Sequence, residues 1–145
     1  MTNTTRGMLL AADDGERSFA PRSLRVVVVD DDRDAALTLA LILRSEGYET
    51  RAFYSGRSAL AAVIESHPDA VVLDINLPEI SGWQIAQTIR ARGGPMPLVI
   101  GISGVYKSGA DKALAHASGF DHYLVKPCPP SELLKLLEPL RSAGA

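Results

Sequence analysis

Short apolar runs and helix-forming stretches alternate along most of the chain. Residues 25–29, 70–74 and 98–102 are runs of mainly apolar, often β-branched residues, and each run gives way to a polar side chain. Such runs are typical of strands buried on both faces of a parallel sheet. Two more strands are predicted at 49–53, where polar and apolar residues alternate, and at 121–125.

Segments rich in helix formers follow these runs. The predicted helices cover residues 35–46, 55–66, 82–92, 107–117 and 131–141. Gly47 and Gly119 are expected to end two of them, and Ser131 is expected to be the N-cap of the last one.

Strands that alternate regularly with helices predict an α/β fold, with helices on both faces of a parallel sheet. Right-handed crossovers then favour a doubly wound, flavodoxin-like sheet of five strands in the order 2-1-3-4-5. Residues 24–142 are expected to form this single domain. Residues 1–23 are rich in polar side chains without a sustained period, so we predict a flexible N-terminal tail.

The composition fits a globular domain and argues against several other classes of protein. Hydrophobic residues make up 46% of the 145 residues, but no apolar stretch is long enough to span a membrane and no signal-peptide pattern is present. The formal net charge of −2 gives no nucleic-acid-binding footprint in this chain. The single cysteine, Cys128, excludes an internal disulfide, and we predict a cytoplasmic protein.

Polar side chains stand where the predicted strands end. Because all strands of a parallel sheet end at the same edge, we expect these side chains to lie close together. They are Asp30, Asp31 and Asp32 after the first strand, Asp74 at the third, Ser103 at the fourth and Lys126 at the fifth.

Several carboxylates near one point repel each other, and a divalent cation relieves that repulsion. A small number of oxygen ligands suits Mg²⁺, so the sequence predicts a magnesium site. An alternative for the acidic run is helix capping, which Asp32 or Asp34 can provide. Asp74 can likewise be an ordinary turn residue at the end of its strand.

A cation, the Lys126 ammonium group and the Ser103 hydroxyl around a carboxylate are suited to phosphoryl transfer. Asp74 is then the predicted nucleophile, and an acyl phosphate is the product. Lys126 as a plain surface lysine remains the alternative. A nucleotide site is disfavoured because no glycine-rich loop follows the first strand. A Ser-His-Asp hydrolase is disfavoured because the histidines are expected to lie away from this edge.

These motifs together resemble the receiver domain of two-component response regulators over about residues 24–142. They are Val-Val-Val-Val-Asp30-Asp31-Asp32, Val-Val-Leu-Asp74-Ile-Asn-Leu-Pro78 with Ser81-Gly82, Val-Ile-Gly-Ile-Ser103-Gly104, and Tyr123-Leu-Val-Lys126-Pro127. The stretch from Gly119 to Pro127 is similar to receivers that work with hybrid histidine kinases. The resemblance implies a phosphorylation-activated signalling switch and not an enzyme that turns over other substrates.

The resemblance also implies a role for each residue of the site. Asp74 is the phosphoacceptor. Asp30 and Asp31 are an acidic pair that binds Mg²⁺, Asp31 directly and Asp30 largely through water, together with Asp74 and the backbone carbonyl of Asn76. Lys126 pairs with the phosphoryl group.

Ser103 is implied as the switch hydroxyl, and Tyr123 as the switch aromatic that turns inward after phosphorylation. Tyr123 as an ordinary strand aromatic is the alternative. The implied partners are a histidine kinase or histidine phosphotransfer protein, and a downstream protein that reads the face made by residues 107–117, 121–125 and 131–141. We expect output through protein contacts, because the chain carries no output domain after its last helix.

Three positions depart from the family pattern or vary within it. Ser103 stands in place of the commoner Thr and lacks the β-branch that stiffens χ1. Gly104 stands where Ala is common, which predicts a looser loop. Val105 cannot orient an attacking water, so we expect a longer-lived phosphoryl group.

The competing prediction is a Mg²⁺-dependent phosphatase with an aspartyl nucleophile on a similar sheet. Such an enzyme needs a second Asp two residues after its nucleophile, where this chain has Asn76. Its acidic pair also comes late in the chain, whereas Asp30 and Asp31 come first. Both differences favour the receiver.

Overall fold

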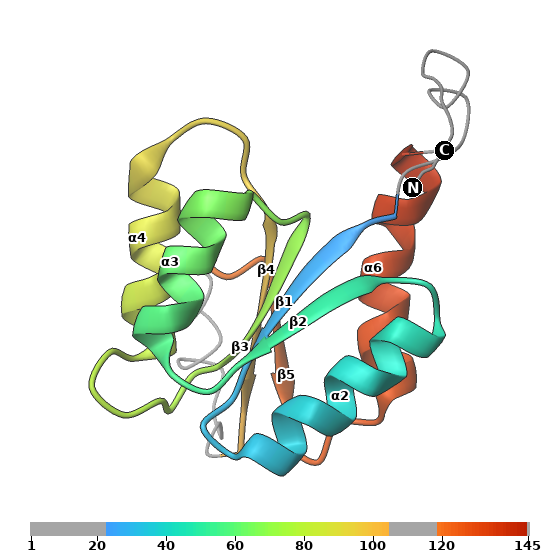
Figure 1. The fold of residues 1–145 in the computed structure, drawn as a ribbon, viewed down its shortest axis with the longest axis horizontal. Coiled ribbons are helices and arrows are strands. Elements are labelled where there is room, and N and C mark those ends of the chain that lie inside the picture. Colours follow the sequence, from blue (N-terminus) through green and yellow to red (C-terminus); the bar gives the residue numbers. More distant parts are fainter. Residues whose placement is uncertain (1–22, 105–118, 145) are drawn as a thin grey trace, which may run out of the picture.

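A parallel sheet of five strands forms the centre of the protein (Figure 1). The computed structural model describes residues 23–104 and 119–144. Its strands are β1 (Arg25–Val29), β2 (Glu49–Phe53), β3 (Ala70–Asp74), β4 (Leu98–Ser103) and β5 (His122–Val125). They lie in the order β2-β1-β3-β4-β5, and every neighbouring pair is parallel, which confirms the predicted topology.

Helices cover both faces of this sheet. They are α2 (Arg33–Ser45), α3 (Gly56–Ser66), α4 (Gly82–Arg92) and α6 (Pro130–Gly144). Helices α3 and α4 pack on one face and α2 and α6 on the other (Figure 1). The helix predicted at 107–117 and the predicted tail up to residue 22 lie outside the described residues. Within the described ranges no helix is both long and apolar enough to cross a bilayer.

The valine run of β1 supplies both cores. Val27 and Val29 pack on the side of α3 and α4, in a cluster that we call the α3–α4 core. Val26 and Val28 point to the other face and join the α2–α6 core. Because both faces are covered, an uninterrupted apolar run is what this strand requires, and no polar alternation is seen.

Side chains cap the N-termini of two helices that follow strand ends. The Asp32 carboxylate accepts from the backbone N–H groups of Asp34 and Ala35 at 3.0 and 3.2 Å, so Asp32 is the N-cap of α2. Ser81 caps α4 through a capping box with Gln84. The capping role that the sequence left open between Asp32 and Asp34 therefore falls to Asp32.

Two predicted boundaries at the end of the chain are wrong by a few residues. Helix α6 begins at Pro130, so Ser131 lies inside its first turn and is not the N-cap. Proline suits a first helical position because its missing N–H has no partner there. The helix then continues past Arg141 to Gly144, although Pro139 lies inside it.

Candidate functional site

Asp74 is the last residue of β3 and is almost fully enclosed, with 9% of its surface exposed. Its neighbours come from the strands on either side. Asp30 follows β1, and Lys126 follows β5 across the end of β4. The Lys126 ammonium nitrogen lies 3.2 Å from Asp74 Oδ2 and 3.5 Å from Asp30 Oδ2. The common strand edge thus brings these residues together, as the sequence predicted.

The pKa values of Asp30 and Lys126 are both shifted at this edge of the sheet. Burial raises the pKa of the Asp30 carboxyl group, and the hydrogen bond from the Asp32 backbone and the attraction of Lys126 only partly offset that rise. Burial would lower the pKa of Lys126, but the attraction of Asp74 and Asp30 outweighs it and raises the pKa. Lys126 is therefore held as an ammonium ion between two carboxylates.

Three carboxylates gather closely enough to share one cation. Asp30, Asp31 and Asp74 each offer an oxygen, and these oxygens all lie within 4.8 Å of one another. All the donor atoms are hard oxygens and Asp31 is exposed to solvent, which leaves room for coordinated water. The residues therefore fit Mg²⁺ better than a softer metal. Within the acidic run, Asp30 and Asp31 belong to this cluster, whereas Asp32 caps α2.

The loop after β3 adds a contact that the sequence did not predict. The Asn76 backbone N–H donates to Asp74 Oδ1 at 3.0 Å, and its side-chain Nδ2 donates to Ser103 Oγ at 3.1 Å. Ser103 has no exposed surface. The resemblance implies a backbone carbonyl ligand at Asn76, and the side-chain contact with Ser103 is not part of that expectation. The signal available was that an amide and a hydroxyl follow the ends of two neighbouring strands.

Close packing of α4 holds this loop in place. The Gly82 N–H donates to the Ile75 carbonyl at 3.0 Å. A Cβ atom on Gly82 would lie 2.8 Å from the Ile75 Cα and 2.9 Å from the Asp74 carbonyl oxygen. Only glycine allows the start of α4 to approach the backbone beside the Asp74 carboxylate so closely.

Strand β5 and the residue after it position Tyr123 and Lys126. The Lys126 N–H donates to the Ser103 carbonyl at 3.0 Å, and the Lys126–Pro127 peptide bond is cis. Tyr123 is half-buried against the α3–α4 core. It pairs with Gly101, two residues before Ser103, so Tyr123 and Ser103 belong to the same face of the sheet.

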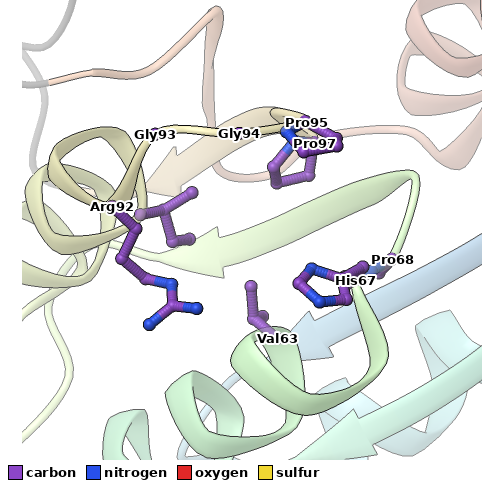
Figure 2. Close-up of a pocket in the computed structure, with 9 residues that line it drawn as sticks. Val63, His67, Pro68, Arg92, Gly93, Gly94, Pro95 and Pro97 are labelled. Carbon is purple, nitrogen blue, oxygen red and sulfur yellow. The ribbon is translucent and has the colours of Figure 1, made fainter.

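Two cavities lined by described residues lie beside opposite ends of the strands. A groove of about 430 Å³ opens between α2 and the loop after β5, and Asp30, Lys126 and the α2 residues Thr38 and Leu39 line it. The other cavity, of about 270 Å³, lies between the ends of α3 and α4, before β3 and β4 begin (Figure 2). None of the described residues that line it carries a carboxylate, so the groove is the one that belongs to the acidic site.

Comparisons with known sequences identify relatives. Residues 26–138 match the family model of the response regulator receiver domain. The chain is 39% identical over 110 residues to the DNA-binding response regulator MtrA of Mycobacterium leprae, which covers 76% of this chain and 48% of that protein. It is 36% identical over 118 residues to the transcriptional regulatory protein PrrA of Mycobacterium bovis, covering 81% and 50%. The chain spans about half the length of these curated relatives, and the likeness to hybrid-kinase receivers stays a prediction.

Solved structures share the whole described fold. The receiver domain of the Francisella response regulator 1452 has a TM-score of 0.77 and 27% identity, covering 85% of this chain and 100% of that chain. A CheY-like receiver domain from Methanospirillum hungatei JF-1 has a TM-score of 0.75 and 26% identity, covering 85% and 97%. Together with the family match, these similarities confirm the predicted fold and show that the chain belongs to the response regulator receiver domain family.

Proposed function

We propose that Asp74 accepts a phosphoryl group from a histidine kinase or a histidine phosphotransfer protein, with Mg²⁺ as cofactor. The observation that carries this proposal is the enclosure of Asp74 by groups suited to phosphoryl transfer. Lys126 lies 3.2 Å from its carboxylate, Asp30 and Asp31 complete a set of oxygen ligands, and the loop after β3 connects it to the Ser103 hydroxyl. Bound Mg²⁺ would neutralise the phosphoryl oxygens at this edge.

The protein groups have distinct parts in the reaction. An oxygen of Asp74 attacks the phosphorus of a phosphohistidine, a P–O bond forms while the P–N bond breaks, and the bonding electrons leave with the imidazole. Lys126 and the Ser103 hydroxyl stabilise the negative charge on the transferring group. Asp30 and Lys126, which lie beside Asp74, also line the groove along α2, so a donor residue seated in that groove would lie next to the site.

The signal follows from the change of charge on Asp74. Ser103 moves to bind the phosphoryl oxygens and Tyr123 turns inward, which biases a two-state element at the ends of β4 and β5. A downstream protein then reads the face formed by residues 107–117, β5 and α6. Residues 107–117 and Val105 lie outside the described residues. The effect of Val105 on the lifetime of the phosphoryl group therefore stays a prediction. The cytoplasm is the proposed location.

A phosphatase with an aspartyl nucleophile is the weaker candidate. Asn76 occupies the position where such an enzyme needs its second carboxyl group, and the Asn76 amide instead bonds Ser103. The family match and the related proteins do not support this alternative.

Phosphotransfer profiling tests the proposed function. The protein is incubated with Mg²⁺ and a panel of radiolabelled histidine kinases, beside Asp74→Asn and the control Glu65→Gln, which removes an exposed carboxylate near the C-terminal end of α3, outside the site and the groove. We expect label on the wild type and on Glu65→Gln, and none on Asp74→Asn. Label that reaches Asp74→Asn as well as the wild type would refute the assignment.

A further inference from the structure

The cavity between the ends of α3 and α4 combines apolar surface with basic side chains. Val63 and Ile89, which are 6% and 4% exposed, supply apolar surface to it. Arg92 extends from the end of α4 and the His67 ring from the end of α3, with Val63 between them (Figure 2). Guanidinium and imidazole groups both donate hydrogen bonds to anions, so the lining suits a ligand that is apolar at one end and negatively charged at the other.

Arg92 is the charged group of this cavity, and no described carboxylate neutralises it. Arg90, in the same last turn of α4, pairs with Asp121 at 2.6 Å and donates to the Gly119 carbonyl at 2.9 Å. Arg92 has no such ion pair among the described residues, and none of the described lining residues is acidic. A guanidinium group presents a planar fork of donors that fits a carboxylate with two parallel hydrogen bonds.

The backbone at this edge of the sheet does not itself attract an anion. Helices α3 and α4 both end here, and the carbonyl groups at a helix C-terminus carry partial negative charge. The attraction for an anion must therefore come from the side chains, chiefly from Arg92. Loss of the Arg92 charge should remove the preference for a carboxylate over an uncharged ligand of the same shape.

The walls of the cavity are stiff and leave room for a small ligand. Pro68, Pro95 and Pro97 line it, and a proline ring fixes the backbone φ angle. Gly93 and Gly94 also line it, with φ angles of 74° and 77° that residues with a side chain rarely adopt. The volume of about 270 Å³ lies below the range of roughly 300–1,000 Å³ that is usual for drug-sized ligands. A smaller molecule therefore fits better.

We propose that this cavity binds a small free carboxylic acid with an apolar body, such as a short branched-chain acid. The carboxylate pairs with the Arg92 guanidinium group, and the apolar body lies on Val63 and Ile89 with the His67 ring beside it. This binding function goes beyond the proposed phosphorylation, because Asp74 ends its strand at the opposite edge of the sheet.

An NMR titration tests the proposal. Isotopically labelled protein is titrated with isocaproate and, as the matched uncharged ligand, with isocaproamide. We expect saturable shifts of the Gly93 and Gly94 amide signals, with a Kd for isocaproate on the order of 1 mM, as suits so small a ligand. Isocaproamide should bind roughly three- to tenfold more weakly, because it lacks the charge-assisted hydrogen bonds. Shifts confined to Gly82 and Lys126 at the acidic site would overturn the proposal.

Two arginine variants identify the charged contact. Arg92→Gln should weaken the binding of isocaproate by roughly three- to tenfold and change that of isocaproamide by less than about twofold. Arg57→Gln is the matched control, because Arg57 is exposed in the first turn of α3 and does not line the cavity. It should change neither affinity by more than about twofold.

The remaining outcomes also decide the proposal. Equal affinity of the wild type for the acid and its amide, or unchanged affinity of Arg92→Gln for isocaproate, would show that Arg92 does not select a carboxylate. Tighter binding of a tripeptide that ends in leucine would refute the free acid as ligand and indicate a peptide C-terminus instead. No readout depends on phosphorylation, so the result is independent of the function proposed for Asp74.

Discussion

Asp30 has a carboxyl group in a mostly buried position, where ionisation is unfavourable. Only 13% of its side chain is exposed, and burial raises its pKa despite the Asp32 backbone N–H and the Lys126 ammonium group nearby. A carboxyl group whose pKa is raised by folding stabilises the folded state at low pH, and that contribution is lost as the pH rises through the raised pKa. At neutral pH the ionised group therefore opposes folding in the absence of metal.

We expect Asp30→Asn to raise the free energy of unfolding of the metal-free protein at neutral pH. The gain should shrink as the pH falls below neutral, because the raised pKa lets the wild-type carboxyl group become protonated. Urea unfolding at several pH values, with and without Mg²⁺, measures this. The same substitution should weaken the stabilisation by Mg²⁺, since it removes one of the gathered oxygens.

Asp34→Asn provides the matched control for that measurement. Asp34 lies in the first turn of α2, where a negative charge interacts favourably with the helix dipole, so its loss should cost about 0.3–1 kcal/mol. The two substitutions are therefore expected to have opposite signs. Destabilisation by Asp30→Asn at neutral pH without metal would contradict the assigned cost of its charge.

The sequence predicted which residues meet at the strand edge, and it could not predict how they share their hydrogen bonds. Strand ends in a parallel sheet place Asp30, Asp74 and Lys126 at one edge, independently of the conformation of the loops. Which member of the acidic run caps α2, and the reach of the Asn76 amide to Ser103, depend on the geometry of loops. Sequence patterns do not determine that geometry, because local hydrogen bonds compete with several backbone conformations.

At the scale of elements, the start of α4 acts as a support for the loop that carries Asp74. We expect Gly82→Ala to lower the free energy of unfolding by about 1–3 kcal/mol, the usual cost of overpacking. The new Cβ would meet the backbone of Ile75 and the Asp74 carbonyl oxygen, and backbone cannot rotate away as a flexible side chain can. Because the displaced segment includes Asp74, the proposed phosphoacceptor, phosphorylation by phosphoramidate should also slow.

Gly104→Ala offers the control for this glycine. Among the described residues, a Cβ there would meet only the Lys126 Cβ, at an ordinary contact distance of 3.8 Å. Thermal melting and phosphorylation rates of the two variants separate close packing from the general effect of losing a glycine. Equal stability of Gly82→Ala and the wild type would show that the loop adapts without strain.

Strand boundaries were easier to predict than helix boundaries. The runs at 25–29 and 70–74 match β1 and β3 to the residue, because each apolar run ends where the chain leaves the core. Strand β5 begins one residue later than predicted, since the Asp121 side chain instead accepts hydrogen bonds from Arg90 and the Val99 N–H. The contribution of such tertiary partners cannot be read from a local pattern.

At the scale of the whole molecule, the sheet separates two cores that share its strands. Val27 and its partner Val71 both belong to the α3–α4 core, whereas Val28 belongs to the α2–α6 core. We expect each Val→Ala change to cost roughly 1–3 kcal/mol from lost burial and the cavity left behind. The costs of Val28→Ala and Val71→Ala should add within about 0.5 kcal/mol, because they share no core.

The pair Val27→Ala and Val71→Ala should depart from additivity, since both changes enlarge one cavity region. Urea unfolding followed by the fluorescence of the single tryptophan, Trp83, measures all the variants, and Trp83 packs edge-on against Phe120 in the α3–α4 core. Strong coupling between Val28 and Val71 would show that the sheet transmits packing changes from face to face.

The covering of the sheet on both faces also bears on how such a domain can diverge during evolution. The groups proposed for phosphoryl transfer follow the ends of strands whose side chains are enclosed, whereas exposed positions such as Leu37 and Leu41 of α2 contribute little to either core. Substitutions at exposed positions usually change stability by less than about 0.5 kcal/mol. Exposed positions can therefore change with little effect on the sheet or on the groups proposed for phosphoryl transfer.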